Sequence, residues 1–569
     1  MSDEQTGMRK GLAQYGDAEF SLFLRKAFIK AMGYSDDALS RPIIGITNTY
    51  SAYNACHRNV PDLIDAIKRG VMLAGGMPLE FPIISMHESF SHPTSMFLRN
   101  LMSMDAEEMV RAQPMDAVVL IGGCDKTVPA LLMGAASADV PAILTVTGPM
   151  ITGSHKGERL GACTDCRRLW AQHRAGAIDG DEIEVISGKL APGPGTCMVM
   201  GTASTMALCA EALGMMLPGG AAIPAVDADR LRHAEATGAR AVAIAQEKLK
   251  PSQVMTPAAF GNALRVLQAI GGSTNAVVHL VAMAGRLGIE LDMTEFDRMG
   301  QETPVLVDLK PSGQHYMEDL HRAGGLATIL REIRDQVDLS CLTVSGRTLA
   351  DNLEGAPPAW AQEVVRPASN PVHAGGGLRV LGGSLAPNGA LIKQAAATAN
   401  LLQHEGRAVV FTSLADMAER LDSPELDVNA DDVLVLQNAG PKGAPGMPEA
   451  GYIPIPRKLA AAGVKDMVRI SDARMSGTAF GTIVLHISPE AAEGGPLALV
   501  QTGDRIRLDV AAGRIDLLVD EVELARRRAQ WKRPAATPER GYAKLYFDEV
   551  LQAEHGCDFN FLRAKPLPR

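Results

Sequence analysis

The chain has 569 residues, a length at which one hydrophobic core usually gives way to two or more domains. Hydrophobic residues make up 46% and charged residues 21%, a globular composition, and the net charge of −10 argues against a nucleic-acid partner. No apolar run approaches the roughly 20 residues of a membrane span, and the charged N-terminus MSDEQTGMRK lacks the apolar stretch of a signal peptide. We therefore expect a cytoplasmic protein with no membrane partner.

The N-terminal part of the chain alternates short apolar runs with longer segments of helical periodicity. Strands are predicted at 42–48, 81–86, 116–123 and 142–148. Between them, segments such as 60–76 and 94–112 carry apolar residues at helical spacing. This alternation predicts an α/β fold over residues 1–365, with a mostly parallel sheet covered by helices. Ligands of such sheets bind at the carboxyl ends of the strands.

The composition changes at residues 343–376, which are rich in Pro, Gly and small polar residues and are predicted to connect two domains. Beyond them come shorter apolar runs separated by turn signals, at 378–385, 408–413, 432–440, 467–471, 482–488, 504–510 and 514–520. Residues 366–569 are therefore predicted to form a smaller, β-rich domain, a barrel or a sandwich. The basic stretch ELARRRAQWKRP (523–534) is predicted to be a solvated helix face.

Three cysteines stand where predicted strands or loops give way to helices. In IGGCDKT (121–127), Cys124 follows a strand and precedes a helix, whose N-terminus favours a thiolate. Cys56, in SAYNACHRN, and Cys197, in APGPGTCMVMG, have comparable settings. A site of three thiolates with an open metal position suits an iron–sulfur cluster that acts as a Lewis acid. Taken singly, each cysteine is more often a small buried core residue.

A second group of candidates carries oxygen ligands. Glu88 follows the predicted strand at 81–86, and Asp125 neighbours Cys124, so the two carboxylates suit a hard cation such as Mg²⁺. Lys126 does not fit this set, because a protonated ammonium has no lone pair for a metal. It must act as a charge partner or be modified into an acceptor. Taken alone, both acids are more typical of a surface.

Two further features have ordinary structural alternatives. Cys163 and Cys166 form a CxxC pair, which is typical of zinc or redox sites. The sequence has no second such pair for zinc and no strand directly before this one, so the segment is predicted to be a loop that runs into a basic helix. His57, beside Cys56, is predicted either to act in a site or to be a hydrogen-bonded structural residue.

Two long segments resemble the signatures of one enzyme family. CDKTVPALLMG (124–134) and ISDARMSGTAFGT (470–482) are similar to the two signatures of the dihydroxy-acid and phosphogluconate dehydratases. Segments 194–207 and 269–280 resemble further blocks of that family, so the resemblance runs from about residue 40 to about residue 550. It implies the removal of water from a 2,3-dihydroxy acid to give a 2-keto acid. It also implies an active site between an α/β domain and a β-rich domain, in a homodimer or homotetramer.

The resemblance assigns roles to the matching positions. Cys56, Cys124 and Cys197 would bind the iron–sulfur cluster, and Mg²⁺ would be bound by Glu88, Asp125, Lys126 in carbamylated form and Glu449. Ser476 would take the proton from C2 of the substrate, with support from Thr478. From the residues alone, a serine before a glycine is more typical of a turn or a helix N-cap.

Within the family, segments 92–127 and 161–178 look more like the sugar-acid branch, especially the pentonate dehydratases for L-arabinonate or D-xylonate. The resemblance therefore implies a sugar-acid (aldonate) substrate and a 2-keto-3-deoxy acid product, and it makes the CxxC pair a feature of this branch outside the cluster. That branch implies a [2Fe-2S] cluster, although three cysteines suit a [4Fe-4S] cluster equally.

Three alternatives stay open. The first is a branched-chain dihydroxy-acid dehydratase of valine and isoleucine biosynthesis, whose substrate has an apolar tail. The second is a metal-independent α/β enzyme in which the cysteines are core residues. The third is a silent relative that only binds a sugar acid; the intact set of Cys, Glu, Asp, Lys and Ser residues argues against it.

Overall fold

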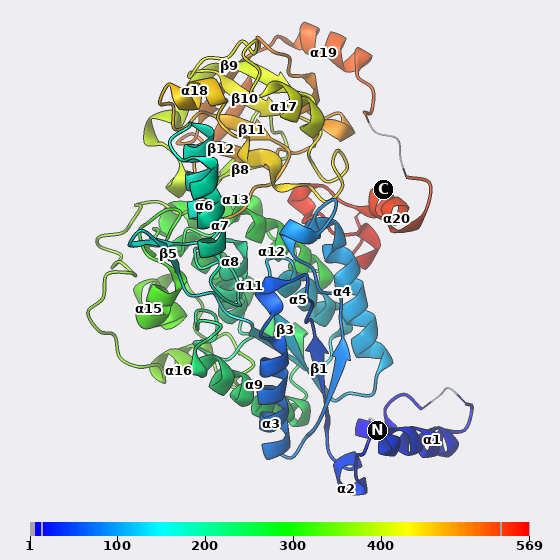
Figure 1. Cartoon of the computed structure of the whole chain (residues 1–569). Coiled ribbons are helices and arrows are strands. Elements are labelled where there is room, and N and C mark those ends of the chain that lie inside the picture. Colours follow the sequence, from blue (N-terminus) through cyan, green and yellow to red (C-terminus); the bar gives the residue numbers. More distant parts are fainter. Residues whose placement is uncertain (1–5, 13–14, 535–537, 568–569) are drawn as a thin grey trace.

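The computed structural model describes residues 6–12, 15–534 and 538–567 (Figure 1). Residues 1–5 of the charged N-terminal stretch lie outside this range. The N-terminal sheet has the order β2-β1-β3-β4, all parallel, which confirms the predicted α/β architecture. Its strands are β1 (Ile43–Asn48), β2 (Met77–Pro82), β3 (Ala117–Gly122) and β4 (Ala142–Val146). A small hairpin, β5 (Gly153–His155) and β6 (Glu158–Leu160), follows.

One predicted strand lies elsewhere in the structure. We expected a strand at 81–86, but β2 ends at Pro82, and residues 83–86 are irregular. The sequence MPLEFP contains two prolines, which lack the N–H that a central strand needs. β2 lies at the edge of the sheet, where a missing donor is tolerated, so the prolines do not prevent a strand there.

Helices cover this sheet because their apolar residues recur on one side. In α3 (Val60–Leu73), the buried residues Leu63, Ile64, Ile67 and Val71 follow helical spacing. α3 packs with α9 (Ala228–Glu247) against the strands, and α5 (Thr127–Ala138) packs against β3 and β4 with α4 (Ser95–Ala112) beside it. Every residue of α8 (Thr202–Ala212) is buried.

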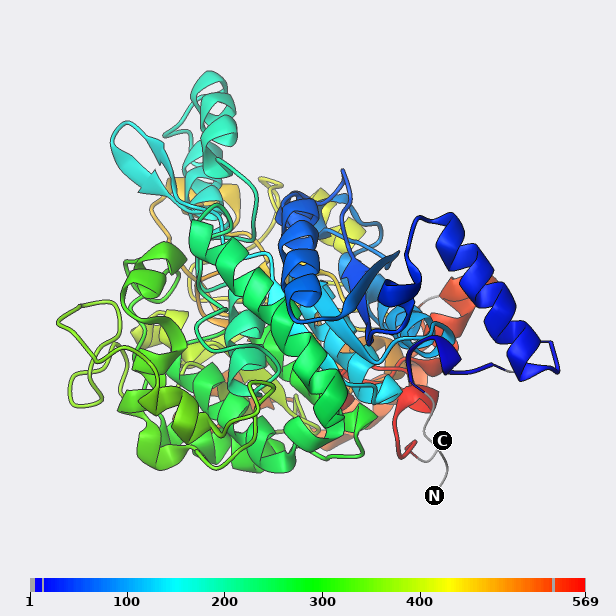
Figure 2. The ribbon, with the colours of Figure 1, turned by 90° about the horizontal axis from the view of Figure 1, so that it is seen from below.

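The remaining helices of this part surround that core. They are α1 (Ala18–Ala31), α2 (Asp36–Leu39), α6 (Thr164–Arg174), α7 (Gly180–Leu190), α10 (Pro251–Val254), α11 (Pro257–Ala269), α12 (Thr274–Arg286), α13 (Met293–Glu302), α14 (Met317–Arg322), α15 (Gly325–Glu332) and α16 (Leu349–Glu354). Figures 1 and 2 both place α1 at the edge of the molecule. No helix in the described part of the chain is long and apolar enough to cross a membrane.

The C-terminal sheet has eight strands in the order β14-β13-β9-β10-β11-β12-β8-β7. They are β7 (Arg379–Leu381), β8 (Ala390–Ile392), β9 (Gln403–Phe411), β10 (Val433–Leu436), β11 (Arg469–Ser471), β12 (Ile483–Leu485), β13 (Arg505–Asp509) and β14 (Arg514–Leu517). A bridge between Gly382 and Arg514 joins the two outer strands, so the sheet is a nearly closed barrel. The predicted β-rich, barrel-like part is confirmed, although β8 was not predicted. Helices α17 (Leu414–Arg420), α18 (Arg457–Ala461) and α19 (Glu521–Gln530) lie in this part.

The last residues of the chain return to the N-terminal part. α20 (Gly541–Glu549) and the segment after it form an aromatic cluster with α4. In this cluster, Tyr546 contacts both Phe97 and Phe559. Next to this cluster, Asp558 accepts hydrogen bonds of 2.6 and 3.0 Å from Arg286 of α12. Both side chains have no exposed surface. This buried ion pair fixes the end of the chain on the N-terminal part.

We expect Asp558→Asn to lower the free energy of unfolding by about 3–5 kcal/mol, because it leaves the buried Arg286 guanidinium with only the more distant Glu107 carboxylate, 3.7 Å away, as a countercharge. Equilibrium urea unfolding measures the change. Asp548→Asn is the matched control, since Asp548 pairs with Lys544 where both side chains are about half exposed, and such pairs contribute about 0–1 kcal/mol. Equal effects of the two substitutions would contradict a structural role for the buried pair.

Candidate active site

A cavity of about 1080 Å³ lies between the two sheets. Its wall includes predicted site residues from both parts of the chain: Cys56, Glu88, Cys124, Asp125, Cys197, Glu449, Ser476 and Thr478. Cys56, Glu88, Cys124 and Asp125 follow β1, β2 and β3, at the carboxyl ends of these parallel strands. Lys126 lies directly behind this wall and is fully buried. The residues predicted from sequence therefore gather at one place.

The sulfur atoms form one side of the site. Cys56, in the short 3-10 helix Ala55–His57, lies close to Cys124, and His87 lies near both, with ligand atoms within 4.8 Å of one another. A shared hydrogen bond with Cys124, together with burial, raises the pKa of Cys56. A hydrogen bond with Cys163 and burial likewise raise the pKa of Cys197. Buried thiols with raised pKa values keep their protons unless a metal ion replaces the protons.

His57 holds the Cys124 loop in position. Its Nε2 accepts a hydrogen bond from the Cys124 N–H at 3.0 Å and lies 3.1 Å from Thr127 Oγ1, while its Nδ1 lies 3.0 Å from the Thr49 carbonyl. Burial lowers the pKa of His57 to about 4, so the ring is neutral and Nε2 is free to accept. Of the two roles predicted for His57, the structural one matches these contacts.

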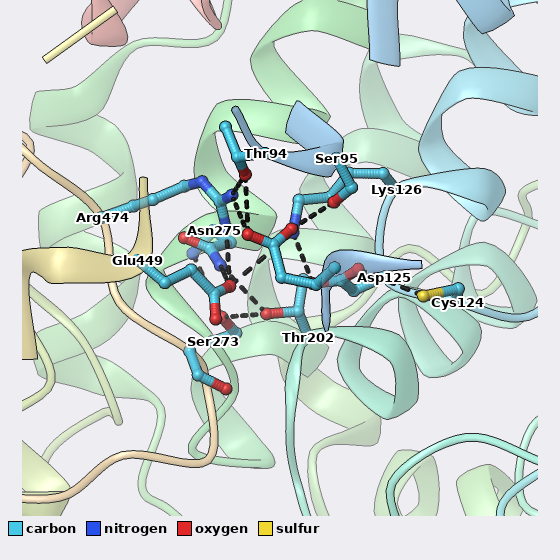
Figure 3. Close-up of polar contacts among 12 residues, drawn as sticks. Thr94, Ser95, Cys124, Asp125, Lys126, Thr202, Ser273, Asn275, Glu449 and Arg474 are labelled. Carbon is cyan, nitrogen blue, oxygen red and sulfur yellow. Dashed lines mark hydrogen bonds and ion pairs between the residues drawn. The ribbon is translucent and has the colours of Figure 1, made fainter. Parts of the chain in front are cut away.

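The oxygen ligands form the other side of the site (Figure 3). One carboxylate oxygen each from Glu88, Asp125 and Glu449 lies within 4.8 Å of the others. Glu449 comes from the 3-10 helix Glu449–Tyr452 of the C-terminal part, so the group joins both halves of the molecule. Thr94 Oγ1 donates to Glu88 at 2.6 Å, and Asn275 Nδ2 donates to Glu449 at 3.3 Å.

Two buried cations stand among these carboxylates. Lys126 Nζ pairs with Asp125 and lies 3.3 Å from Glu88 and 3.7 Å from Glu449. Arg474 donates to Glu449 at 2.6 Å and to Glu88 at 3.0 Å. Burial and the charge of Arg474 oppose protonation of Lys126, but the carboxylates outweigh both and raise its pKa.

The two glutamates respond differently to this environment. Burial acts to raise the pKa of Glu88, but Arg474 and Lys126 hold it far below its usual range. Burial is the largest effect on Glu449 and raises its pKa. The group therefore combines three acids with two cations in little space, an arrangement that depends on close charge compensation.

Ser476 lies in a turn after β11 and faces the cavity. Its Oγ is 2.8 Å from Thr478 Oγ1, and the Thr478 N–H donates to it at 3.4 Å. The turn packs tightly, since a Cβ at Gly477 would come within 2.6 Å of the Ser273 side chain. The geometry gives Ser476 two hydrogen-bond partners and access to the cavity, so both predictions, a turn residue and a base, fit it.

Sequence reasoning missed two residues at the site and did not predict the location of a third. Arg474 lies inside segment 470–482, yet its contact with Glu88 spans 386 positions, and no local pattern signals it. Lys393, directly after β8, is fully buried and donates to the Gly477 carbonyl at 3.1 Å. Cys163 Sγ lies 3.5 Å from Cys197 Sγ. The resemblance makes the CxxC pair a feature outside the cluster, whereas both of its cysteines lie on the wall of the same cavity.

Comparison with known proteins identifies the family. Residues 41–352 match the N-terminal model and residues 363–557 the C-terminal model of the dihydroxy-acid/6-phosphogluconate dehydratases. The chain belongs to this family. The break between the two matched ranges falls just before the predicted domain boundary at 365/366. As a dehydratase of this family, the protein is a hydro-lyase.

Several relatives of this dehydratase align with it over nearly the whole length of both chains. An L-arabonate dehydratase of Azospirillum brasilense is 49% identical over 96% of each chain. A 6-deoxy-6-sulfo-D-gluconate dehydratase of Pseudomonas putida is 45% identical over 93% of this chain and 92% of its own. A dihydroxy-acid dehydratase of Pyrococcus abyssi is 39% identical over 94% of this chain and 97% of its own. The predicted resemblance to the sugar-acid branch is confirmed.

Lys393 makes the stability of the dehydratase depend on pH. Burial lowers the pKa of Lys393 from 10.5 to about 7, so between these pH values the unfolded chain binds a proton that the folded chain does not. Stability contributed by this group therefore falls as the pH drops from 10.5 towards 7, by at most about 1.4 kcal/mol per pH unit. We expect Lys393→Met to gain stability relative to the wild type as the pH falls through this window.

Unfolding by urea at pH 7.5 and pH 9.5 is the test, since roughly two pH units within the window give a resolvable difference. Lys393→Arg is the control: its guanidinium stays charged in both states, so it also loses the pH dependence but is less stable than Lys393→Met throughout. Parallel stability profiles for the wild type and Lys393→Met would show that Lys393 keeps an ordinary pKa.

Proposed function

We propose that this dehydratase uses Mg²⁺ and an iron–sulfur cluster to convert an aldonate, a pentonate such as L-arabinonate or D-xylonate, to its 2-keto-3-deoxy acid. The observation that carries the proposal is the convergence of a thiol group, a carboxylate group and the Ser476 turn on one cavity. The relatives named for arabonate and sulfogluconate are more similar to this chain than the Pyrococcus abyssi dihydroxy-acid dehydratase, which supports the sugar-acid substrate over the branched-chain alternative.

Three thiols on one cavity wall support an iron–sulfur cluster, although Cys197 lies beside Cys163 and outside the close group of Cys56, His87 and Cys124. Cys56, Cys124 and Cys197, which all line the cavity, would hold it as thiolates. The raised pKa values of Cys56 and Cys197 fit this assignment, because closely packed buried thiols become stable thiolates only next to a positive charge. We propose a [2Fe-2S] cluster, with [4Fe-4S] as the alternative.

The carboxylates fit Mg²⁺ by their chemistry and charge. Glu88, Asp125 and Glu449 supply oxygen ligands at close range. Lys126 would join them as a carbamate: its ammonium loses one proton, and the resulting amine adds CO₂ and loses a second proton. This change replaces one positive charge by one negative charge, a difference of two that a divalent cation offsets. Carbamylation and Mg²⁺ binding would therefore leave the charge of the buried group unchanged.

Ser476 would act as the base that removes the C2 proton. When bound, Mg²⁺ would stabilise negative charge on the carboxylate and 2-hydroxyl of the substrate, and the cluster would offer a Lewis acid to the 3-hydroxyl. A serine hydroxyl is a weak base unless its anion is stabilised. The Thr478 hydroxyl and backbone N–H, 2.8 and 3.4 Å from Ser476 Oγ, are placed to donate to that anion.

We also propose a homodimer or homotetramer in the cytoplasm. The support for assembly is the surface of α1, on which Phe23, Phe28 and Met32 are 65–71% exposed. Large apolar side chains gathered on one exposed helix are typical of a surface that another protein covers.

The first test is keto-acid formation by anaerobically purified protein with Mg²⁺. The substrates are L-arabinonate, D-xylonate, D-gluconate and 2,3-dihydroxyisovalerate, and the visible spectrum is recorded on the same sample. We expect a brown protein with its highest kcat/KM on a pentonate, because a pocket built for hydroxyls rejects an apolar tail. Turnover confined to 2,3-dihydroxyisovalerate would establish the branched-chain alternative instead.

Two substitutions separate the roles of the site. We expect Cys124→Ser to lose both the visible absorbance and turnover, because it removes a cluster ligand. Ser476→Ala should keep the absorbance and lose turnover by at least about 100-fold, the lower end of the contribution of a positioned base. Cys209→Ser is a control, since Cys209 is buried in the core away from the cavity. A colourless but active Cys124→Ser variant would refute the ligand role, and an active Ser476→Ala variant would leave Ser476 as a turn residue.

A further inference from the structure

Helix α6 carries Cys166 of the CxxC pair and the basic residues that follow it, which the proposed chemistry does not use. The helix lines the active-site cavity. At its start, Thr164 Oγ1 donates to the Thr478 carbonyl at 2.9 Å, which attaches the helix to the Ser476 turn. At its end, Arg174 donates to Asp422 at 2.7 Å and to the Ile455 carbonyl at 3.2 Å. Figure 1 shows α6 reaching up beside the C-terminal sheet. The helix is therefore held at both ends along one wall of the cavity.

Arg167 differs from the other arginines of this helix. Arg168 pairs with Asp165 and Glu158, and Arg174 pairs with Asp422. In the part of the chain that the structure describes, no carboxylate forms an ion pair with Arg167, and its buried Nε has no hydrogen-bond partner. A buried donor without a partner costs free energy. The terminal N–H groups of Arg167 form no hydrogen bond with the described residues, and Arg167 lies on the cavity wall, so these groups can donate to a ligand there.

The guanidinium of Arg167 is held by an aromatic ring. Its central carbon lies over the Tyr452 ring, 4.7 Å from the centroid, in a cation–π contact. Tyr452 ends the 3-10 helix that Glu449 begins, so Arg167 contacts the short element that carries one of the three carboxylates. This contact restricts the motion of the guanidinium, which reduces the entropy lost when it binds a ligand.

We propose that Arg167 binds the hydroxyl-bearing tail of the sugar acid and is a specificity-determining residue of this dehydratase. The inference rests on the proposed function, in which the carboxylate, C2 and C3 of the substrate face the carboxylate group, the thiols and Ser476. The carbons beyond C3 then extend along the remaining wall, where α6 presents Arg167. Its N–H groups donate to hydroxyl oxygens of the tail, which an apolar branched tail lacks.

The test compares Arg167→Met with the wild type on L-arabinonate and on 2,3-dihydroxyisovalerate. We expect kcat/KM on L-arabinonate to fall about 10- to 100-fold, the effect of losing hydrogen bonds from a charged donor. Turnover of 2,3-dihydroxyisovalerate should change by less than about twofold, because its tail accepts no such bonds. Arg167→Lys, which keeps the charge but loses the planar fork, should recover only part of the activity. Arg168→Met is the matched control, expected to affect both substrates alike.

A binding measurement separates this inference from the proposed function. Calorimetric titration of L-arabinonate into Ser476→Ala, with and without Arg167→Met, reports tail binding without turnover. Weaker binding in the double variant supports the role of Arg167 even if the reaction differs from the one proposed. Equal binding in both variants, or an equal loss of kcat/KM on both substrates, would overturn it. Absence of sugar-acid turnover in the wild type would count against the proposed function alone.

Discussion

The contact of Arg474 with Glu88 and Glu449 is the interaction on which the rest of the site depends. The two glutamates belong to different halves of the molecule, and Arg474 binds both at 3.0 Å or less. Without buried cations, three carboxylates within 4.8 Å of one another would repel strongly in a medium of low polarity. Arg474 and Lys126 together allow the carboxylates to approach and, by doing so, fix how the C-terminal barrel faces the N-terminal sheet. The cavity between them follows from this closure.

Much of the architecture is predictable because it follows from local patterns. Alternating strands and helices predict the parallel sheet, and ligands of such a sheet bind at the carboxyl ends of its strands, which is where Cys56, Cys124 and Asp125 stand in the sequence. The β-rich character of the C-terminal part is equally visible in short apolar runs. β8 (Ala390–Ile392) was not predicted, and its place in the sheet is given by its antiparallel pairing with β7 and β12.

Other features cannot be read locally because they are contacts between distant segments. Arg474 meets Glu88 across 386 positions, and Thr164 meets the Thr478 carbonyl across 314. The CxxC pair is the clearest example. Its spacing is typical of either zinc or redox sites, and the sequence does not reveal that Cys163 lies beside Cys197. That location depends on how α6 packs against the Ser476 turn. Burial keeps the His57 ring neutral, so that its Nε2 can accept the hydrogen bond from the Cys124 N–H. The sequence does not reveal this burial, and so it left the role of His57 open.

The proposed division of the cavity would let one chemistry serve several substrates across the family. The carboxylate, C2 and C3 are common to sugar acids and branched dihydroxy acids, and the residues proposed to handle them come from the sheet edge and the Ser476 turn. The tail is what differs, and α6 stands outside that sheet, attached to the C-terminal part through side chains such as Thr164 and Arg174. Substitutions on α6 can therefore change the tail pocket without disturbing the charge balance around Lys126. Such a separation permits relatives to differ in the substrate tail. A relative named for a sulfonated gluconate is 45% identical to this chain.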